Sequence, residues 1–500
     1  MTTSWRGADI IQTIAHLPRH CSGNAPGVPL SMGILAPTLT QNQVAMGLTT
    51  LRHHLARYFA MAAMAVIVAT SVALVAIPKR DGHGAEGDGA MLATLSGSFV
   101  YRPWISPADP RQGYGKTLMV GKGKEFATIS LAIRAAQDGD IIAIAPGTYA
   151  GESMIIARND LIVRGQDGIA TIDAADTSLM QNKAILVTQG RNLLLENLEL
   201  KGAISTDQNG AGIRAEGPSL HVRHCFIHDN QTGILVANRR DSTLLVEYSE
   251  FARNGHRSGQ AHQIYAGLSA QLTLRYNFIH DSFVGSAIKS RAARTVIEYN
   301  FVADGASGSA NYTVDLSNGG YAVLVGNVLE KASHAQNHTF VSYAPESLAW
   351  PENALFMAYN TLVNDRFDGN FIHNHSRIEL HAVNNLFIGR AAIVDGGPVQ
   401  LLSNIVMGNA TTHDDRLGGS SDSGHNQVFA TVGIADRAQL DYRLIPASPA
   451  IDAASPLPAH FPAALTPLWQ YRHAADRVVR RRVGAQADVG AFEFGATTMP

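Results

Sequence analysis

The sequence predicts an all-β protein built as a β-solenoid, and three observations lead there. The chain has 500 residues with 46 glycines, and only 16% of its residues are charged, which suits many short strands and turns. Short apolar segments recur between those turns, at irregular periods within the ~20–50 residues typical of solenoids. Several of the segments end in asparagine, at positions separated by 23, 27, 33, 25 and 19 residues: Asn277, Asn300, Asn327, Asn360, Asn385 and Asn404.

The recurring asparagine has a physical reason in such a fold. One coil cannot bury its own apolar face, whereas stacked coils share a continuous core. An asparagine at the same place in each coil can bond the copies above and below it, as in the side-chain ladders of stacked sheets. Asparagine also tolerates the left-handed backbone of a tight bend, so we expect that conformation at these positions.

Three segments precede the predicted coils. Residues 1–58 show no periodicity and are expected to be disordered, with Met46 as an alternative start of the protein. Residues 59–77 form an uninterrupted apolar run of 19 residues, close to the ~20 that cross a bilayer as a helix. A signal anchor and a cleaved signal peptide both fit this run. Residues 78–115 are a linker. We therefore expect an exported protein, anchored through 59–77 and facing the periplasm or cell exterior, or secreted if the signal is cleaved.

The coils are expected over residues 116–450, with 451–500 as a C-terminal tail packing on the last coils. Apolar residues at helical spacing within 126–136 predict an amphipathic helix. Because the open end of a solenoid exposes core and strand edges, this helix is expected to cap the first coil.

Two stretches carry a resemblance to a known family. The opening from Phe126 through Pro146-Gly147-Thr148-Tyr149, and coils such as Tyr276-Asn277-Phe278-Ile279-His280-Asp281, resemble pectate-lyase-like right-handed parallel β-helix proteins. The resemblance covers roughly residues 116–495 and implies the right-handed parallel β-helix of the pectin lyase fold, of an exported bacterial type. It is specific for the fold and weak for the reaction, because this fold hosts lyases, hydrolases, epimerases and adhesins.

A second strand in each coil can be aligned on an inward apolar residue. The aligned residues are Ile213, Ile234, Ile264, Ile288, Val314, Val341, Ile372 and Ile393. Side chains alternate across a strand, so each following residue points outward. Polar residues are concentrated at the outward positions of the middle coils and two residues further on, whereas Leu235 and Val394 stand at the ends. The polar members are Tyr265, Lys289, Arg291, Asp315, His373 and His375.

This outer face predicts a groove for an acidic polysaccharide. β-Elimination needs a base for the proton next to a uronate carboxylate, a cation that neutralises the carboxylate, and an acid for the leaving oxygen. Lys289 is the candidate base, with its pKa lowered by Arg291, and Arg291 is the candidate carboxylate clamp. Tyr265 or His262 is the candidate acid. The remaining candidates are expected to bind substrate: Asp315, His338, Glu346, His373 and His375. The Lys-x-Arg pattern resembles basic catalytic residues of β-helix polysaccharide lyases and uronan epimerases.

Other readings stay open. The same proton abstraction would serve a uronan C5-epimerase, and Lys289, Arg291 and Asp315 would also make a plain charge ladder on a non-catalytic, glycan-binding solenoid. A glycoside hydrolase needs two carboxyls about 5–9.5 Å apart, and the sequence places only Asp315 on this face. No metal site is predicted, although Ca²⁺ dependence stays open. The formal net charge of −2 gives no reason to expect nucleic acid as a partner, and a monomer is expected.

Overall fold

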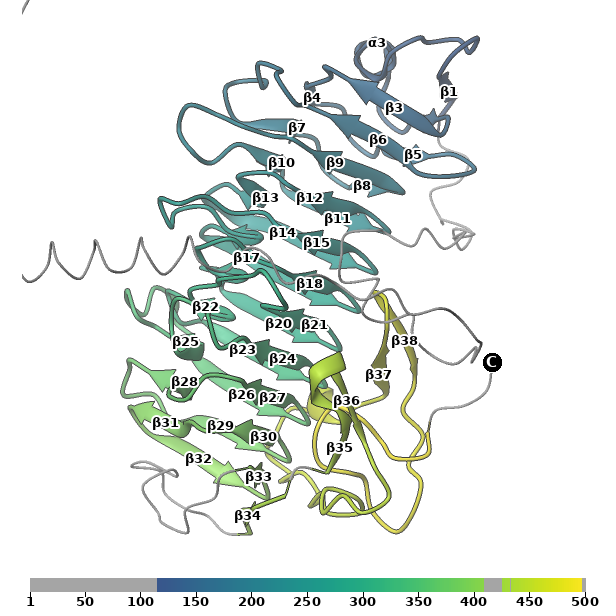
Figure 1. Cartoon of the computed structure of the whole chain (residues 1–500). Helices are drawn as coiled ribbons and strands as arrows, with labels where there is room; N and C mark the ends of the chain where they lie inside the picture. Colours follow the sequence, from purple (N-terminus) through teal and green to yellow (C-terminus); the bar gives the residue numbers. More distant parts are fainter. Residues whose placement is uncertain (1–114, 409–424, 432, 497–500) are drawn as a thin grey trace, which may run out of the picture. The chain divides into compact units, whose positions relative to one another are not determined.

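The folded chain is a right-handed parallel β-helix of about 11 turns, in a computed structural model that describes residues 115–408, 425–431 and 433–496. Each coil contributes one strand to each of three parallel sheets, and the coils stack one on another (Figure 1). The expectations for residues 1–58, 59–77 and most of 78–115 lie outside the described residues. Within the described residues, no helix is long and apolar enough to cross a bilayer.

Sheet 1 has twelve strands, each bonded to the strands of the coils before and after it. They are β1 (Thr117–Val120), β2 (Ile141–Ile144), β5 (Ile162–Gly165), β8 (Leu193–Glu196), β11 (Ser219–Arg223), β14 (Arg239–Glu247), β17 (Ser269–Arg275), β20 (Arg294–Glu298), β23 (Tyr321–Val325), β26 (Ala354–Ala358), β29 (Leu380–Val383) and β32 (Val399–Leu402).

Sheet 2 has ten strands and carries the predicted groove. They are β4 (Met154–Ile156), β7 (Ala184–Thr188), β10 (Ala211–Ala215), β13 (Thr232–Val236), β16 (Ile264–Ala266), β19 (Ile288–Ser290), β22 (Val314–Leu316), β25 (Thr339–Tyr343), β28 (Asn370–Asn374) and β31 (Ala392–Gly396).

Sheet 3 has twelve strands and lies next to the C-terminal tail. They are β3 (Gly147–Ala150), β6 (Ala170–Asp173), β9 (Leu198–Lys201), β12 (Phe226–His228), β15 (Glu250–Ala252), β18 (Phe278–His280), β21 (Phe301–Ala303), β24 (Val328–Lys331), β27 (Thr361–Asn364), β30 (Leu386–Gly389), β33 (Ile405–Met407) and β34 (Gln427–Phe429).

The predicted N-terminal helix is α3 (Ile129–Ala135), and it closes the first coils. Thr128 caps it by accepting from the Leu131 amide at 3.3 Å, and the Glu152 carboxylate accepts from the Ile129 amide at 2.8 Å. Ile129 and Ala132 are fully buried in the same apolar cluster as the strands beneath them. The capping role expected from helical spacing is confirmed.

The asparagine ladder is confirmed, and its backbone explanation is wrong by one residue. Asn300 Nδ2 donates to Asn327 Oδ1 at 3.1 Å, and the Asn300 amide donates to the same oxygen at 2.9 Å. The same double contact links each predicted asparagine to the next and runs on to Asn426. The left-handed conformation lies on the residue before each asparagine, for example Tyr276 at φ 60° and Tyr299 at φ 55°. Asparagine is therefore selected for its amide hydrogen bonds.

Residues 433–496, which we call the tail and which begin before the expected boundary at 451, lie along sheet 3 (Figure 1). It contains β35 (Ile434–Asp436), the 3-10 helix η2 (Arg437–Gln439), β36 (Asp441–Leu444), the 3-10 helix η3 (Ala463–Leu465), β37 (Trp469–Arg472) and β38 (Asp476–Val479), with β35–β36 and β37–β38 antiparallel. The Gly490 amide donates to the Asn384 carbonyl at 3.0 Å in a late coil. Arg477 Nη1 donates to Tyr276 Oη at 2.7 Å in a middle coil, so the tail spans more than the last coils.

Candidate functional site

The outer face of sheet 2 gathers the predicted polar residues in register. β16, β19 and β22 pair in parallel, and their registers set Tyr265 beside Lys289 and Lys289 beside Asp315. The preceding residues of these strands, the isoleucines and valine used for the alignment, are fully buried in the core. The predicted alternation and alignment are confirmed over these coils.

The predicted alignment is wrong at the last coil. Ile372 pairs with Val394 and not with Ile393, so Asp395 stands beside His373 where Val394 was expected. His373 Nδ1 lies 3.5 Å from Asp395 Oδ2 as a result. Ile393 and Val394 are both apolar, so the sequence left the phase of this strand ambiguous. The polar row is one coil longer than predicted.

Lys289 and Arg291 share the carboxylate of Glu346 at the centre of this face. Lys289 Nζ lies 3.0 Å from Asp315 Oδ2 and 3.2 Å from Glu346 Oε1, and Arg291 Nη2 lies 2.8 Å from the same Glu346 oxygen. Asp315 is held from its other side by the Ser317 hydroxyl at 2.8 Å. We call these four charged residues, with Tyr265, the basic cluster.

The predicted lowering of the Lys289 pKa is wrong. Burial of Lys289 alone lowers its pKa, but the carboxylates of Asp315 and Glu346 outweigh burial and hold the pKa above its ordinary value. Arg291, which was expected to lower it by like-charge repulsion, has its own charge compensated by Glu346. Lys289 is therefore an ammonium ion at neutral pH in the ligand-free protein.

Glu346 reaches the basic cluster from a connection rather than from a strand. It belongs to the segment 344–353 between β25 and β26, which we call the strap. The amides of Glu346 and Ala349 donate to the carbonyls of Ser317 and Asn318 at 3.0 and 3.1 Å. Trp350 Nε1 donates to the Arg291 carbonyl at 3.0 Å. These contacts fix the strap across the neighbouring coils, so it walls one side of the sheet 2 face.

His262 and Tyr265 flank the cluster on the side of the earlier coils. The rings lie 5.3 Å apart edge to face, and the Tyr265 ring centre is 5.7 Å from Arg291 Cζ. Burial, helped by the neighbouring cations Lys289 and Arg291, lowers the pKa of His262 to about 3. His262 Nδ1 accepts from the Ser286 amide at 2.9 Å, so a neutral ring carries its proton on Nε2.

The other predicted residues stand further away. The registers place His373 two coils beyond Asp315, and its ring stacks on His375 at 3.6 Å. Burial and the charge of His373 lower the pKa of His375. His338 is exposed and precedes β25, whereas Glu346 follows the same strand, so the structure does not bring the two together.

The structure adds residues that sequence reasoning missed. Trp350 anchors the strap through its hydrogen bond to the Arg291 carbonyl. Arg240 Cζ lies 4.5 Å from the centre of the Trp350 ring. The contact between Arg240 and Trp350 joins segments more than a hundred residues apart. The repeat pattern contains no signal for it because strap and loop residues do not repeat.

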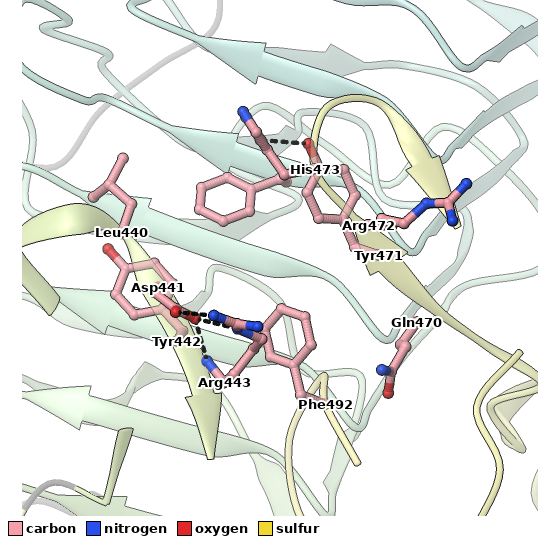
Figure 2. Close-up of a pocket in the computed structure, with 10 residues that line it drawn as sticks. Leu440, Asp441, Tyr442, Arg443, Gln470, Tyr471, Arg472, His473 and Phe492 are labelled. Carbon is pink, nitrogen blue, oxygen red and sulfur yellow. Dashed lines mark hydrogen bonds and ion pairs between the residues drawn. The ribbon is translucent and has the colours of Figure 1, made fainter. Parts of the chain in front are cut away.

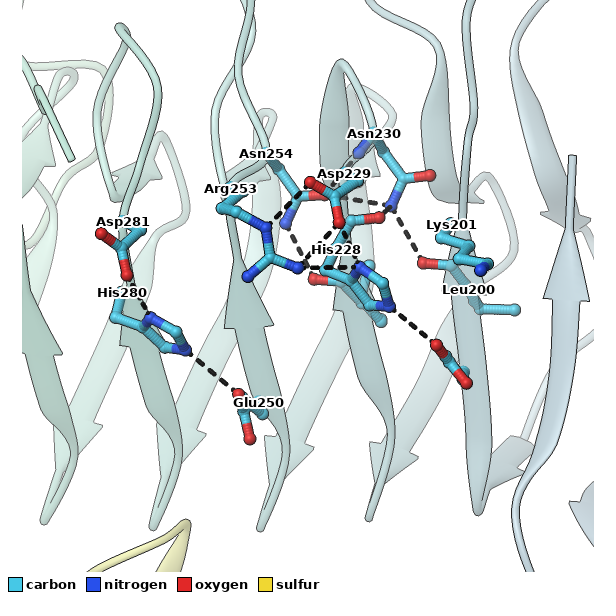
Figure 3. A network of polar contacts seen from close by, with 12 residues as sticks. Leu200, Lys201, His228, Asp229, Asn230, Glu250, Arg253, Asn254, His280 and Asp281 are labelled. Atoms are coloured by element: carbon cyan, nitrogen blue, oxygen red, sulfur yellow. Dashed lines mark hydrogen bonds and ion pairs between the residues drawn. The ribbon is translucent and has the colours of Figure 1, made fainter. Parts of the chain in front are cut away.

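A second polar network lies on sheet 3 and was also missed (Figure 3). His280 contacts Asp281 at 2.7 Å through Nδ1 and Glu250 at 3.1 Å through Nε2. His228 contacts Asp229 at 2.5 Å and Glu199 at 2.9 Å in the same way. The available signal was the repeated Phe-Ile-His-Asp at 226–229 and 278–281.

A cavity of about 270 Å³ lies between sheet 3 and the tail (Figure 2). Its lining is largely aromatic, and Arg443 at its edge pairs with Asp441 of the same strand. The lining residues are Phe301, Leu440, Asp441, Tyr442, Arg443, Gln470, Tyr471, Arg472, His473 and Phe492. None of these residues comes from the basic cluster. Within residues 115–408, 425–431 and 433–496, no group of three or more His, Cys, Asp or Glu side chains is placed to hold a metal ion.

Comparisons with known proteins agree with this architecture. Residues 159–329 match the family model of the right-handed β-helix region. No curated protein matches the chain. Similar solved structures include pectate lyase Pel9A, at 13% identity and a TM-score of 0.46, covering 76% of this chain and 96% of that one. An alginate lyase from Paenibacillus sp. str. FPU-7 has 17% identity and a TM-score of 0.42, covering 57% and 97%. The right-handed parallel β-helix architecture is shown by the family model over residues 159–329 and by the strand pairing of this chain itself.

Proposed function

We propose that the protein binds an acidic polysaccharide on the outer face of sheet 2 and cleaves it by β-elimination. The observation that carries the proposal is a pair of adjacent cations, Lys289 and Arg291, that share the carboxylate of Glu346, while Asp315 also pairs with Lys289. Two cations two residues apart on one strand edge suit a uronate carboxylate, which a guanidinium grips with two hydrogen bonds. The aromatic ring of Tyr265 beside them suits a sugar ring.

In the proposed reaction, Arg291 neutralises the substrate carboxylate, so that the proton on the neighbouring carbon becomes acidic. Lys289 in its neutral form removes that proton, and the electron pair forms a carbon–carbon double bond as the glycosidic C–O bond breaks. Tyr265 donates a proton to the leaving oxygen. His262 donates a hydrogen bond to the substrate from its Nε2–H and keeps this proton, so its ring stays neutral. Asp315, His373 and His375 extend the binding face along the coils.

Because the pKa of Lys289 is raised, the proposed mechanism predicts a specific dependence of the rate on pH. Burial lowers that pKa, but the Asp315 and Glu346 carboxylates raise it further than burial lowers it. Only the neutral amine can accept a proton, so the active fraction grows as the pH rises. The rate is expected to increase toward alkaline pH, with a slope near one in a logarithmic plot below the Lys289 pKa.

The test is the ultraviolet absorbance of unsaturated uronate ends, with polygalacturonate, alginate and other polyuronates as substrates, with and without Ca²⁺. Lys289→Ala is expected to lower the rate by about 10²–10⁴-fold, the usual contribution of a general base. Lys183→Ala is the matched control, because Lys183 pairs with Asp207 at 2.6 Å outside the basic cluster. Reducing ends released without ultraviolet absorbance would indicate hydrolysis instead.

Binding without cleavage is the second candidate, favoured by the full compensation of Lys289 by two carboxylates. A protein of that kind would bind uronates and release no product. A uronan C5-epimerase would exchange the C5 proton with solvent without chain cleavage, so proton exchange is the assay that follows a blank absorbance result.

We further propose that the β-helix works as a monomer outside the cytoplasm, tethered by residues 59–77 or released by their cleavage. The apolar run of 19 residues supports this location. Fractionation of cells expressing the full chain, with and without residues 1–77, tests it. Cytoplasmic recovery of the full chain would contradict the proposal.

A further inference from the structure

We propose that the Glu346 carboxylate occupies, in the ligand-free protein, the place of a ligand carboxylate, and that an acidic sugar binds by displacing it from Lys289 and Arg291. The proposal rests on the acidic ligand of the proposed function, but not on its cleavage. It defines a carboxylate subsite and makes Glu346 an internal competitor for that subsite.

The first argument is that Glu346 is more exposed than the two cations it pairs with. The side chains of Lys289 and Arg291 are 15% and 27% exposed, and that of Glu346 is 39% exposed. Glu346 is therefore more accessible to solvent than the two cations to which it is bound. A ligand approaching the basic cluster meets this carboxylate before it meets either cation, so a tight contact with the cations requires Glu346 to move aside.

The second argument is that Glu346 can move while the strap stays in place. The strap is held through its backbone and through neighbours of Glu346: the Glu346 and Ala349 amides donate to sheet 2 carbonyls, and Asn318 Nδ2 donates to Ser347 Oγ at 2.7 Å. Trp350 is tied to the Arg291 carbonyl. None of these bonds uses the Glu346 carboxylate, so rotation of that side chain breaks only its ion pairs.

The third argument is the charge balance of the basic cluster. Lys289 and Arg291 carry two positive charges against the two negative charges of Asp315 and Glu346. Asp315 is 4% exposed at its side chain and stays bound to Lys289 and Ser317 when Glu346 leaves. A neutral sugar that displaced Glu346 would leave an uncompensated, partly buried cation, which is unfavourable. A carboxylate ligand restores neutrality, so the exchange selects acidic sugars.

The fourth argument concerns Arg291. Among the described residues, its guanidinium pairs with Glu346, and its Nε is buried with no hydrogen-bond partner. A buried donor without a partner is unusual in a folded protein and marks a place where an acceptor is missing. A ligand carboxylate that takes both Nε and Nη2 would satisfy this donor, which the single Glu346 oxygen on Nη2 does not do.

The experiment compares wild type, Glu346→Gln and Glu352→Gln by calorimetric titration with galacturonate and mannuronate tetrasaccharides and a neutral galactose tetrasaccharide. Glu352 lies in the same strap and is exposed, so its substitution removes the same net charge away from the cluster. Glu346→Gln is expected to tighten uronate binding about two- to fivefold, the scale of a half-exposed ion pair, with no gain for the neutral sugar. Glu352→Gln is expected to bind as the wild type does.

Equal or weaker uronate binding by Glu346→Gln would overturn the proposal, because Glu346 would then support the cluster rather than compete for it. An equal gain in both variants would also overturn it, since long-range charge would explain the change. If none of the three proteins bound the uronate tetrasaccharides, the proposal would also be overturned. If Glu346→Gln bound uronates more tightly but no polymer gave a product, the proposed carboxylate subsite would stand and the proposed lyase activity would be rejected.

Discussion

Sheets 2 and 3 carry comparable rows of charged side chains on their outer faces, yet the two rows differ in how their charges are compensated. On sheet 3, His280 is fully buried and lies between Asp281, 5% exposed, and Glu250, 7% exposed, which come from the same and the neighbouring coil (Figure 3). On sheet 2, Lys289 meets Asp315 of the neighbouring coil and Glu346 of a connection 57 residues away.

The difference teaches how to separate structural charges from binding charges in a solenoid. A buried ion pair whose partners lie in a strand or directly after one, as Glu250 and Asp281 do, has no exposed group that a ligand can replace, and breaking it leaves an unpaired charge in the interior. A half-exposed partner on a connection can be exchanged at small cost. The sheet 3 histidines are therefore assigned to stability and the sheet 2 cluster to recognition. The three predictions that follow test this division.

The largest effect is expected from His280→Ala. The substitution leaves the carboxylates of Glu250 and Asp281 buried without their shared cation and removes the stack on Phe278, at 4.1 Å between ring centres. The free energy of unfolding is expected to fall by about 3–5 kcal/mol, measured by urea denaturation. His373→Ala, on sheet 2, should cost about 0–1 kcal/mol, because its partner Asp395 is half-exposed. Similar losses in both variants would remove the distinction between the two faces.

Much of the β-helix that carries these two faces can be predicted from the sequence. The spacing of Asn277 through Asn404 predicts the coils and their ladder, and inward residues such as Ile264 and Ile288 predict the sheet 2 register. Such local, repeated signals work because each coil faces the same neighbours. They fail at β31, where two adjacent apolar residues hide the phase.

The charge state of the cluster was not readable in the same way. The pKa of Lys289 depends on Glu346, which belongs to a connection with no repeat, so a reading limited to Arg291 as a neighbour gave the wrong sign. His338 shows the converse error: it is close to Glu346 in sequence, but the two flank opposite ends of β25. Contacts made by connections require the three-dimensional structure.

The second prediction, of intermediate size, is that the free energy of unfolding depends on pH through His280 on sheet 3. Burial lowers the pKa of His280, but Asp281 and Glu250 outweigh burial and raise the pKa above its ordinary value of 6.5. A raised histidine pKa gives stability that is complete below about pH 6.5 and is lost as the pH rises through the folded-state pKa, with at most about 1.4 kcal/mol per pH unit. Glu330, whose pKa burial raises to about 8, adds a loss of the same sign between about pH 4.5 and 8.

The histidine part is isolated by His280→Gln, which removes the titrating group and leaves Glu330 in place. Urea unfolding of wild type and variant from pH 5 to 9 should show a shallower decline in the variant above pH 6.5. Parallel curves would mean that His280 does not take up a proton on folding, and the assignment of a stabilising imidazolium on sheet 3 would be withdrawn.

The smallest effect is expected where the same substitution is made on sheet 2. Glu346→Gln removes a 39% exposed carboxylate while the backbone bonds of the strap remain, so the free energy of unfolding should change by less than about 1 kcal/mol. Glu250→Gln makes the identical change beside His280 on sheet 3 and should cost about 1–3 kcal/mol, because it weakens a fully buried charged hydrogen bond. Urea unfolding at pH 6 compares the two. A loss at Glu346 as large as that at Glu250 would show that the strap carboxylate is part of the scaffold, and an exchangeable carboxylate at that position would be untenable.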